Sequence, residues 1–569
     1  MASRNGTSAP AARSDHHAQL LAHLGAAGAL ASVAALIGWD QETYMPPAAA
    51  AARAAQAEEL SRVVHQRRTD PRLGALLRGC QADPALARPA DGPTAASLRQ
   101  ALRDYDRLTR LPEALVAELA KAGSLAQEAW KKARAENDFA AFAPHLERML
   151  ELTRHKARKL AEPAPAGTAS AGTATAGPSE PYDALLDEYE PGATAAQLEA
   201  VFEPLRARLS GLVARVAPRS RASALRPLAA VTRRTTQAAQ HALGRAVLGA
   251  VGFDLDAGRL DVTAHPFCSG IAAGDTRLTT RYTAATFLEP LYATLHEGGH
   301  GLYEQGLPKA EHPGTPLSEA VSLGVHESQS RLWENFVGRS RAFWRWALPL
   351  AKKTLGAGAR SLTLDAVYAA ANHVRPSLIR VEADEATYNL HVMVRFRLER
   401  ELIAGDLRVR DLPRAWNTLY RDILGVRVPD DRRGCLQDVH WSFGLIGYFP
   451  TYTLGNLYAA QLWEAVRRDV PTLEGDIARG RFGGLLGWLR QRIHRHGRRY
   501  TAAELCQQAT GAALSPEPLL RHLEGKLLPL HGLGGARRRQ TGSGASAAAR
   551  PAVRTPTRRT PAGGASTRR

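Results

Sequence analysis

The chain has 569 residues, of which 44% are hydrophobic and 23% charged, as is ordinary for a soluble globular protein. Its formal net charge of +19 would favour a nucleic-acid binder, but nine of these charges belong to residues 532–569, which hold no acidic residue. The remaining +10 is spread over the rest of the chain and indicates no partner. The composition therefore excludes a nucleic-acid-binding body and leaves only the arginine-rich tail as a contact for nucleic acid or another acidic partner.

The N-terminal region contains an apolar stretch but no convincing membrane segment. Residues 1–15 begin with an Ala- and Ser-rich stretch and are predicted to be mobile. The Ala/Gly-rich stretch 24–38 is too short to span a bilayer and runs into Trp39-Asp40-Gln41-Glu42 without a convincing cleavage site. The four cysteines are far apart and match neither a zinc knuckle nor a disulfide framework. We therefore expect a cytoplasmic protein with no membrane anchor.

Helical periodicity is nearly continuous through the middle of the chain. The predicted helices cover residues 146–160, 198–216, 238–248, 288–303, 321–337, 383–403 and 457–466. Only residues 260–282 have the Gly, Thr and Pro punctuation and the short alternation of a strand pair. The fold class is therefore predicted to be mainly α, with a small β element just before helix 288–303.

Two low-complexity stretches interrupt or follow this helical region. Residues 164–181 form an Ala/Gly/Thr/Pro insert that cannot bury enough apolar surface to offset its ordering entropy, so we expect a loop between helices. Residues 532–569 are predicted to be a disordered tail. Residues 16–531 are therefore predicted to be one helical domain.

The chemistry is predicted to lie on helix 288–303, where His296-Glu297-Gly298-Gly299-His300 matches H-E-x-x-H. Side chains four residues apart share a helix face, so both imidazoles can reach one metal ion. Glu297 lies one position round, close enough to take a proton from a metal-bound water without being a ligand. The two glycines would let a strand or a substrate come close to the metal face. Alone, the motif also fits two helix histidines with ordinary hydrogen bonds.

A metal site of this kind needs a third protein ligand. Glu319 and Glu327 are both plausible, and because they are eight residues apart, roughly on one helix face, spacing does not choose between them. One would bind the metal, and the other could accept a hydrogen bond that orients a ligand imidazole.

Several motifs between Trp39 and about Tyr458 resemble, in order, those of the carboxypeptidase Taq family of metallocarboxypeptidases. They are Trp39-Asp40-Gln41-Glu42-Thr43 with Met45-Pro46-Pro47, His265-Pro266-Phe267, Asp275-Thr276-Arg277-Leu278-Thr279, the His296–His300 motif, His326-Glu327-Ser328-Gln329, Ile379-Arg380-Val381-Glu382-Ala383-Asp384 and Gly434-Cys435-Leu436-Gln437-Asp438-Val439-His440-Trp441.

The resemblance implies a metallocarboxypeptidase with Glu327 as the third ligand and Glu319 as the alternative. It also implies one zinc ion per subunit, with cobalt as the other candidate metal, and an elongated helical homodimer with a deep groove. We expect peptide substrates and broad specificity. The insert at 164–181 and the arginine-rich tail depart from the family pattern.

Removal of a C-terminal residue requires recognition of a free carboxylate, for which an arginine fork is suited. Arg380 is the first choice, because it is predicted to open a helix on which Asp384, Tyr388 and His391 follow at turn-like spacing. An interhelical hydrogen-bond network is the alternative role of Arg380. Arg432 and its neighbour Arg433 are the other candidates, although at least one of them should be a surface charge.

Two further groups complete the predicted site. His440 and Tyr448 can each donate a hydrogen bond to the oxyanion that forms when the carbonyl becomes tetrahedral. His265 and Arg277 are predicted to shape the end of the groove, with ordinary structural pairing as an equal alternative. Gln437 is assigned to the substrate-binding set.

The predicted mechanism is metal-assisted hydrolysis of the last peptide bond. Glu297 deprotonates the metal-bound water and then passes the proton to the leaving amine. A metallo-endopeptidase of the same helical type is one alternative. The other is a non-catalytic binding protein whose arginine tail recruits an acidic partner.

Overall fold

The computed structural model describes residues 10–162, 180–263, 265–282 and 285–533. The predicted mobile segment 1–15 lies mostly outside these residues, although helix α1 already begins at Pro10. The insert 164–181 and the tail 532–569 lie almost wholly outside the described residues, so their assignments as loop and disordered extension stay predictions.

The fold is mainly α, which confirms the predicted class. The helices before the sheet are α1 (Pro10–Thr43), α2 (Ala50–Arg68), α3 (Pro71–Gln81), α4 (Pro84–Ala87), α5 (Pro93–Arg110), α6 (Glu113–Glu136), α7 (Phe139–Ala161), α8 (Pro181–Leu186), α9 (Ala195–Val216), α10 (Arg226–Thr232) and α11 (Gln237–Val251). Those after it are α12 (Leu288–Glu304), α13 (Leu323–Arg331), α14 (Arg341–Leu355), α15 (Leu364–Ala371), α16 (Tyr388–Ala404), α17 (Leu412–Leu419), α18 (Pro450–Asp469), α19 (Leu473–Ile477), α20 (Gly483–Arg492), α21 (Ala502–Thr510) and α22 (Glu517–Leu530).

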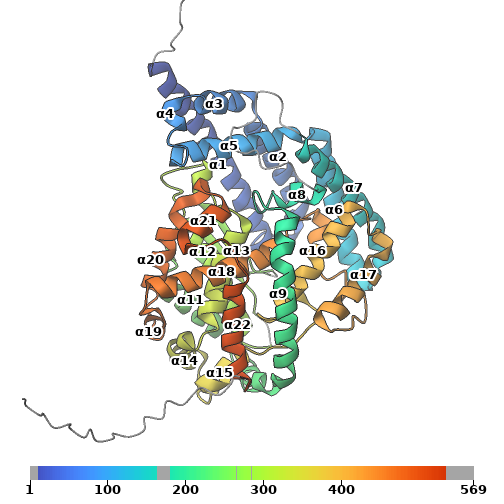
Figure 1. Cartoon of the computed structure of the whole chain (residues 1–569), viewed down its shortest axis with the longest axis vertical. Coiled ribbons are helices and arrows are strands. Elements are labelled where there is room, and N and C mark those ends of the chain that lie inside the picture. The colour runs from blue at the N-terminus through green and yellow to red at the C-terminus, as the bar shows by residue number, and fades with distance from the viewer. Residues whose placement is uncertain (1–9, 163–179, 264, 283–284, 534–569) are drawn as a thin grey trace, which may run out of the picture.

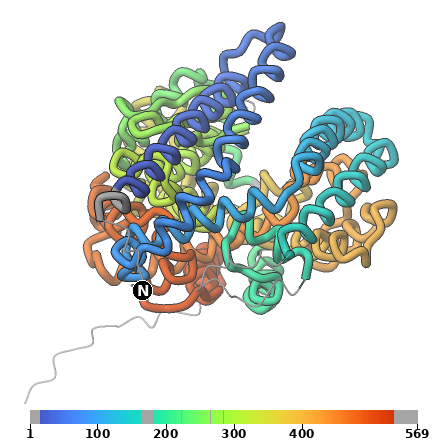
Figure 2. Tube along the Cα trace, turned by 90° about the horizontal axis from the view of Figure 1, so that it is seen from above, coloured from blue at the N-terminus to red at the C-terminus, as the bar shows by residue number. Residues whose placement is uncertain are grey.

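The helices are arranged around a central group that includes α12, α13 and α18. Helices α3, α4 and α5 lie at one end of the longest axis, and α14 and α15 lie at the other (Figure 1). Seen from above, the α1/α2 pair and the α6/α7 pair project as two separate arms (Figure 2).

Helix ends follow local sequence signals. The capping box of Thr194 and Gln197 starts α9, where each side chain accepts from the other residue's backbone N–H. Asp138 caps α7 in a similar way by accepting from the Ala141 amide. At their C-terminal ends, α11 and α16 stop at Gly252 (φ 97°) and Gly405 (φ 93°), left-handed positions that favour glycine.

Several predicted helix boundaries are wrong, and two of them have a clear local reason. The helix predicted at 321–337 begins at Leu323, because the Ser322 hydroxyl accepts from the Val325 amide and caps it. It then continues as a π-helix, Leu332–Gly338. The helix predicted at 383–403 begins only at Tyr388, because the Asp384 carboxylate accepts from the amides of Ala386 and Thr387 and holds a turn there.

The small β element has three strands instead of the predicted pair. They are β1 (Gly258–Val262), β2 (Cys268–Ala272) and β3 (Asp275–Thr280), in the order β1-β3-β2. Strand β3 pairs parallel with β1, with Leu260 opposite Leu278, and antiparallel with β2. Leu278 lies against α12 at Gly301, where a Cβ would come within 2.8 Å of its Cδ2 atom. The sheet therefore packs directly on the helix that carries the H-E-x-x-H motif.

Glycines also bring the neighbouring helices close to α12 and α13. A Cβ at Gly299 would lie 2.5 Å from the backbone oxygen of Gln329 on α13. A Cβ at Gly455 on α18 would lie 2.4 Å from the Cγ atom of Glu327. The glycines of the motif therefore admit other helices, and not the strand or substrate that the sequence suggested.

Helix α1 is longer than its apolar stretch suggested. Residues Asp15–Thr43 are long and apolar enough to cross a membrane by length and composition alone. In the structure, however, α1 packs on the rest of the protein. Leu20 is buried in a small hydrophobic cluster with residues of α3 and α5. Trp39 is also buried, with the guanidinium of Arg277 4.2 Å from its ring centroid. These contacts make α1 part of the fold.

Candidate metal centre

Two imidazoles and one carboxylate converge between α12 and α13. His296 and His300 lie one turn apart on α12, and their Nε2 atoms are 3.6 and 3.3 Å from Oε2 of Glu327 on α13. Ligand atoms of all three residues lie within 4.8 Å of one another, which is true of no other group of such residues in the described part of the chain. Two imidazoles and a carboxylate are a known donor set of catalytic zinc sites, so these residues fit a divalent ion.

Glu319 is not part of this group. It precedes α13 in extended backbone, and its carboxylate forms an ion pair with Arg498 at 2.8 Å. Because Ser322 starts the helix after Glu319, the two glutamates do not share the helix face that their spacing suggested. The structure therefore places Glu327 with the two imidazoles.

Glu297 follows directly after His296 and is buried, with 6% of its surface exposed. Burial, and to a lesser degree the charge of Glu327, raise the pKa of the Glu297 carboxyl to about 7. A carboxyl with this pKa can both hold and release a proton near neutral pH, as a general base must.

Charged partners orient two of the three ligands. Glu334 of the π-helix lies 3.0 Å from Nδ1 of His296, which leaves Nε2 for a metal. Arg331 donates to Oε1 of Glu327 at 2.7 Å and to Glu334 at 3.1 Å. Burial opposes ionisation of Glu327, but Arg331 and the adjacent His296 hold its pKa well below the usual range. Glu327 is therefore a carboxylate whose Oε2 atom faces the imidazoles.

The third ligand is oriented differently, since Nδ1 of His300 faces another imidazole. Nδ1 of His326 lies 2.6 Å from it, and Nε2 of His326 lies 2.7 Å from Oε1 of Glu304. Sequence reasoning missed His326, Glu304, Arg331 and Glu334. The signal for Arg331 was its four-residue spacing from Glu327 on one helix. The others are paired across 22 to 38 residues, which spacing alone does not reveal.

Arg380 is buried in a network of its own. Its Nε and Nη2 atoms donate to Oδ1 of Asp438 at 3.1 and 2.9 Å, and Nη1 donates to the Tyr388 hydroxyl at 2.9 Å. Gln437 accepts a hydrogen bond from the Arg380 amide at 2.9 Å, and Arg395 donates one to Oδ2 of Asp438 at 2.6 Å. This is the interhelical network given as the alternative role of Arg380. Arg380 itself lies in a short 3-10 turn, Arg380–Glu382, and does not open an α-helix as predicted.

His440 and Tyr448 are neighbours, with ring centroids 5.4 Å apart. Burial and the charge of Arg380 lower the pKa of His440 to about 3, so its imidazole is neutral at pH 7. Burial and the charge of Glu327 raise the pKa of Tyr448 to about 12, so its phenol keeps its proton. Both are therefore neutral hydrogen-bonding groups, as the sequence analysis required.

The remaining predicted substrate-binding residues lie at the surface or in local pairs. Arg277 pairs with Asp275 through two contacts of 2.8 Å and covers Trp39, which is the structural pairing given as its alternative. His265 is exposed between β1 and β2. Arg432 is exposed and donates to the backbone oxygen of Ala135 on α6.

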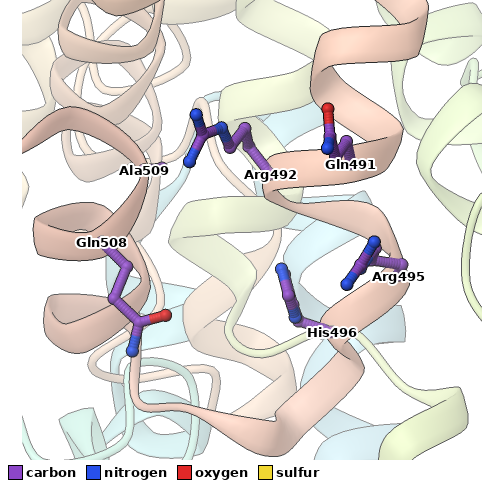
Figure 3. Close-up of a pocket in the computed structure, with 6 residues that line it drawn as sticks. All are labelled: Gln491, Arg492, Arg495, His496, Gln508 and Ala509. Carbon is purple, nitrogen blue, oxygen red and sulfur yellow. The ribbon is translucent and has the colours of Figure 1, made fainter.

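A surface pocket of about 220 Å³ lies away from the metal ligands. Its lining residues are Gln491, Arg492, Arg495, His496, Gln508 and Ala509 (Figure 3). Both α20 and α21 end beside it, and the two arginines complement the negative ends of those helices. None of the three candidate metal ligands lines it.

The helical fold and the His296, His300 and Glu327 triad together define a metallopeptidase. Comparison with known proteins agrees: the sequence pattern of the carboxypeptidase Taq (M32) metallopeptidases matches residues 19–527. The chain is 47% identical to thermostable carboxypeptidase 1 of Thermus thermophilus over 509 residues, covering 88% of this chain and 96% of that protein. It is 35% identical to carboxypeptidase 1 of Bacillus subtilis, covering 87% and 95%.

Solved structures of carboxypeptidases are similar to this chain over most of its length. The M32 carboxypeptidase of Deinococcus radiodurans R1 superposes with a TM-score of 0.84 at 41% identity, covering 91% of this chain and all of that one. Metallocarboxypeptidase 1 of Trypanosoma cruzi gives 0.82 at 35% identity, covering 90% and 99%. The chain belongs to the carboxypeptidase Taq (M32) family and is a metallocarboxypeptidase, as the motifs predicted. Family membership implies a divalent metal ion.

Proposed function

We propose that the chain is a zinc-dependent carboxypeptidase of broad specificity in which Glu297 is the general base. The observation that carries this proposal is the convergence of His296, His300 and Glu327, with Glu297 buried beside them. Zinc is preferred to cobalt because two imidazoles and one carboxylate are a frequent catalytic zinc set. A bound divalent ion would supply Lewis acidity that activates water and polarises a peptide carbonyl.

Glu297 takes the proton of the attacking water and gives it to the leaving amine. Burial raises the pKa of its carboxyl, which favours its taking up the proton. His440 and Tyr448 donate hydrogen bonds to the oxyanion. Nδ1 of His440 supports this role, because it is buried and has no hydrogen-bond partner among the described residues.

We assign recognition of the substrate's terminal carboxylate to Arg380. Its group holds two guanidinium ions, Arg380 and Arg395, against the single carboxylate of Asp438. The buried excess of one positive charge favours an incoming anion. His265 and Arg277 remain proposed as residues that shape the end of the groove. Arg432 remains the alternative binder of the terminal carboxylate, and Gln437 a further substrate-binding residue.

The test is the variant Glu297→Gln, assayed with a short peptide and its C-terminally amidated twin. We expect the variant to bind zinc as the wild type does and to lose at least about a thousandfold in kcat. Wild-type enzyme should cut the free peptide one residue at a time and lose most activity on the amide. Equal cleavage of both peptides would support the metallo-endopeptidase. Metal binding without hydrolysis would support the binding protein.

We also propose a homodimer, as the resemblance to the family implies, and a cytoplasmic location, as the cysteine spacing suggested. Light scattering of the purified full chain measures its mass directly. A mass of one subunit, 61.3 kDa, at all micromolar concentrations would contradict the dimer.

A further inference from the structure

Each imidazole ligand must present a bare Nε2 atom to the metal, so its proton must lie on Nδ1. For His296, the carboxylate of Glu334 accepts that proton directly at 3.0 Å. For His300, the neighbour is the imidazole of His326, which can be a donor or an acceptor. The protonation pattern of His326 therefore decides whether His300 is ready to bind.

If His300 is to bind the metal through Nε2, the contacts of His326 leave one consistent arrangement of protons. The rings of His300 and His326 are inclined by only 28°, with Nδ1 atoms 2.6 Å apart, which suits a hydrogen bond near both ring planes. If Nδ1–H of His300 donates, Nδ1 of His326 must be bare. The proton of His326 is then on Nε2, where it donates to Glu304 at 2.7 Å. The chain of bonds runs in one direction, from ligand to carboxylate.

Glu304 is held as a carboxylate at the end of this chain. Burial opposes its ionisation, but the hydrogen bond from His326 and the ion pair with Lys309 lower its pKa below the usual range. Lys309 donates to Oε2 of Glu304 at 2.5 Å and to the backbone oxygen of Gly270 at 3.1 Å. A Cβ at Gly270 would lie 2.0 Å from that Oε2 atom, so strand β2 encloses the carboxylate. Glu304 can therefore only accept, which fixes the proton of His326 on Nε2.

We infer that His326 is a positioning residue that sets the protonation pattern of the ligand His300, and that Glu304 and Lys309 hold His326 in that role. The inference rests on the proposed metal centre and adds a requirement for retaining the metal. Because it concerns the metal and not the peptide, it can be tested without measuring turnover.

A loss of zinc affinity on replacing His326 could also come from a loss of stability alone. A second His–Glu–Lys group in the protein serves as the control for that explanation. His522 lies 3.0 Å from Glu385, which is also paired with Lys526. This second His–Glu–Lys group is buried in α22 and the loop before α16, and none of its residues is among the metal ligands. Removing His522 removes the same chemistry from a site that includes none of the metal ligands, although its ring also packs on Phe336 of the π-helix that carries Glu334.

The experiment compares His326→Leu, His326→Asn and His522→Leu with the wild type. Urea unfolding of each metal-free protein measures its stability. The zinc Kd of the folded metal-free protein is measured separately, by competition with a chromogenic chelator. We expect His326→Leu to raise the zinc Kd about 10- to 100-fold. His326→Asn keeps an acceptor oxygen near the position of Nδ1, so its Kd should stay within about fivefold of the wild type. His522→Leu should lose stability but keep the wild-type Kd.

Three results would overturn the inference. The first is a His326→Leu variant that binds zinc within twofold of the wild type. The second is His326→Asn being as weak as His326→Leu, since the acceptor at Nδ1 would then not matter. The third is an equal loss of affinity in His522→Leu, which would make the effect one of stability. Failure of the wild type to bind zinc would instead refute the metal centre itself.

Discussion

Glu399 is a buried carboxyl whose ionisation is opposed by its surroundings. It accepts from the Tyr182 hydroxyl, the Trp441 indole and the Gly447 amide. Even so, burial raises its pKa from 4.5 to about 7. The folded state therefore binds this proton more tightly than the unfolded chain does, and the associated stability is complete below pH 4.5 and lost as the pH rises through 7.

Glu399→Gln removes this dependence, because an amide does not ionise. We expect the unfolding free energy of the wild type to fall by roughly 2.5 kcal/mol more than that of the variant between pH 5 and 8. Urea unfolding at several pH values measures the difference. Glu401→Gln on the same helix is the control and should follow the wild type. Parallel pH profiles for wild type and Glu399→Gln would show that Glu399 ionises normally.

At the level of residues, the sequence predicts the ligands better than their partners. His296, Glu297 and His300 follow from a helix period, and resemblance to the family singled out Glu327. Glu334 contacts His296 across 38 residues, and Glu304 contacts His326 across 22, so neither pairing could be predicted from spacing. Arg380 was predicted to open a helix, and its partner Asp438, 58 residues away, could not be predicted from spacing.

The crossing of α12 and α13 depends on the absence of a side chain at Gly299. The atoms that a Cβ would meet are the Gln329 oxygen and the Ser330 Cα, both backbone, which a rotamer change cannot move. Gly299→Ala must therefore separate the two helices that carry the metal ligands. We expect it to lower the unfolding free energy by about 1–3 kcal/mol and to weaken zinc binding.

Gly487 provides the matched control for this prediction. It lies inside α20, and a Cβ there would have no heavy atom within 4 Å. Gly487→Ala should be neutral or stabilising by up to about 1 kcal/mol, because alanine favours the helix. Urea unfolding and zinc titration of both variants measure the effects. A Gly299→Ala protein as stable as Gly487→Ala would contradict the close crossing.

The predicted helix starts differ in accuracy, since α7 and α18 begin seven residues before their predicted starts. Helix α12 begins where its period indicated, at Leu288. The starts of α13 and α16 were wrong because Ser322 and Asp384 redirect backbone hydrogen bonds. The parallel pairing of β1 with β3 joins segments separated by β2, and such pairing leaves no local pattern in a sequence.

For the molecule as a whole, the metal centre is built from side chains that are already paired. Glu327 is bound to Arg331, His296 to Glu334 and His300 to His326. We therefore expect chelation to leave the far-ultraviolet circular dichroism unchanged and to abolish activity reversibly. Zinc at about 100 to 1,000 times its Kd should stabilise the protein by roughly 3–4 kcal/mol. An unfolded metal-free protein would show that the ion, and not these pairs, organises the centre.

The small hydrophobic cluster of α1, α3 and α5 is separate from the main core, although both are well buried. Arg498 links the small cluster to the main core, since it forms ion pairs with Asp104 on α5 and with Glu319 just before α13. Packing that is not continuous allows one region to open while the other stays closed. The α1, α3 and α5 cluster is thus joined to the rest of the protein partly by the ion pairs of Arg498. We expect this cluster to unfold first on warming or in concentrated salt.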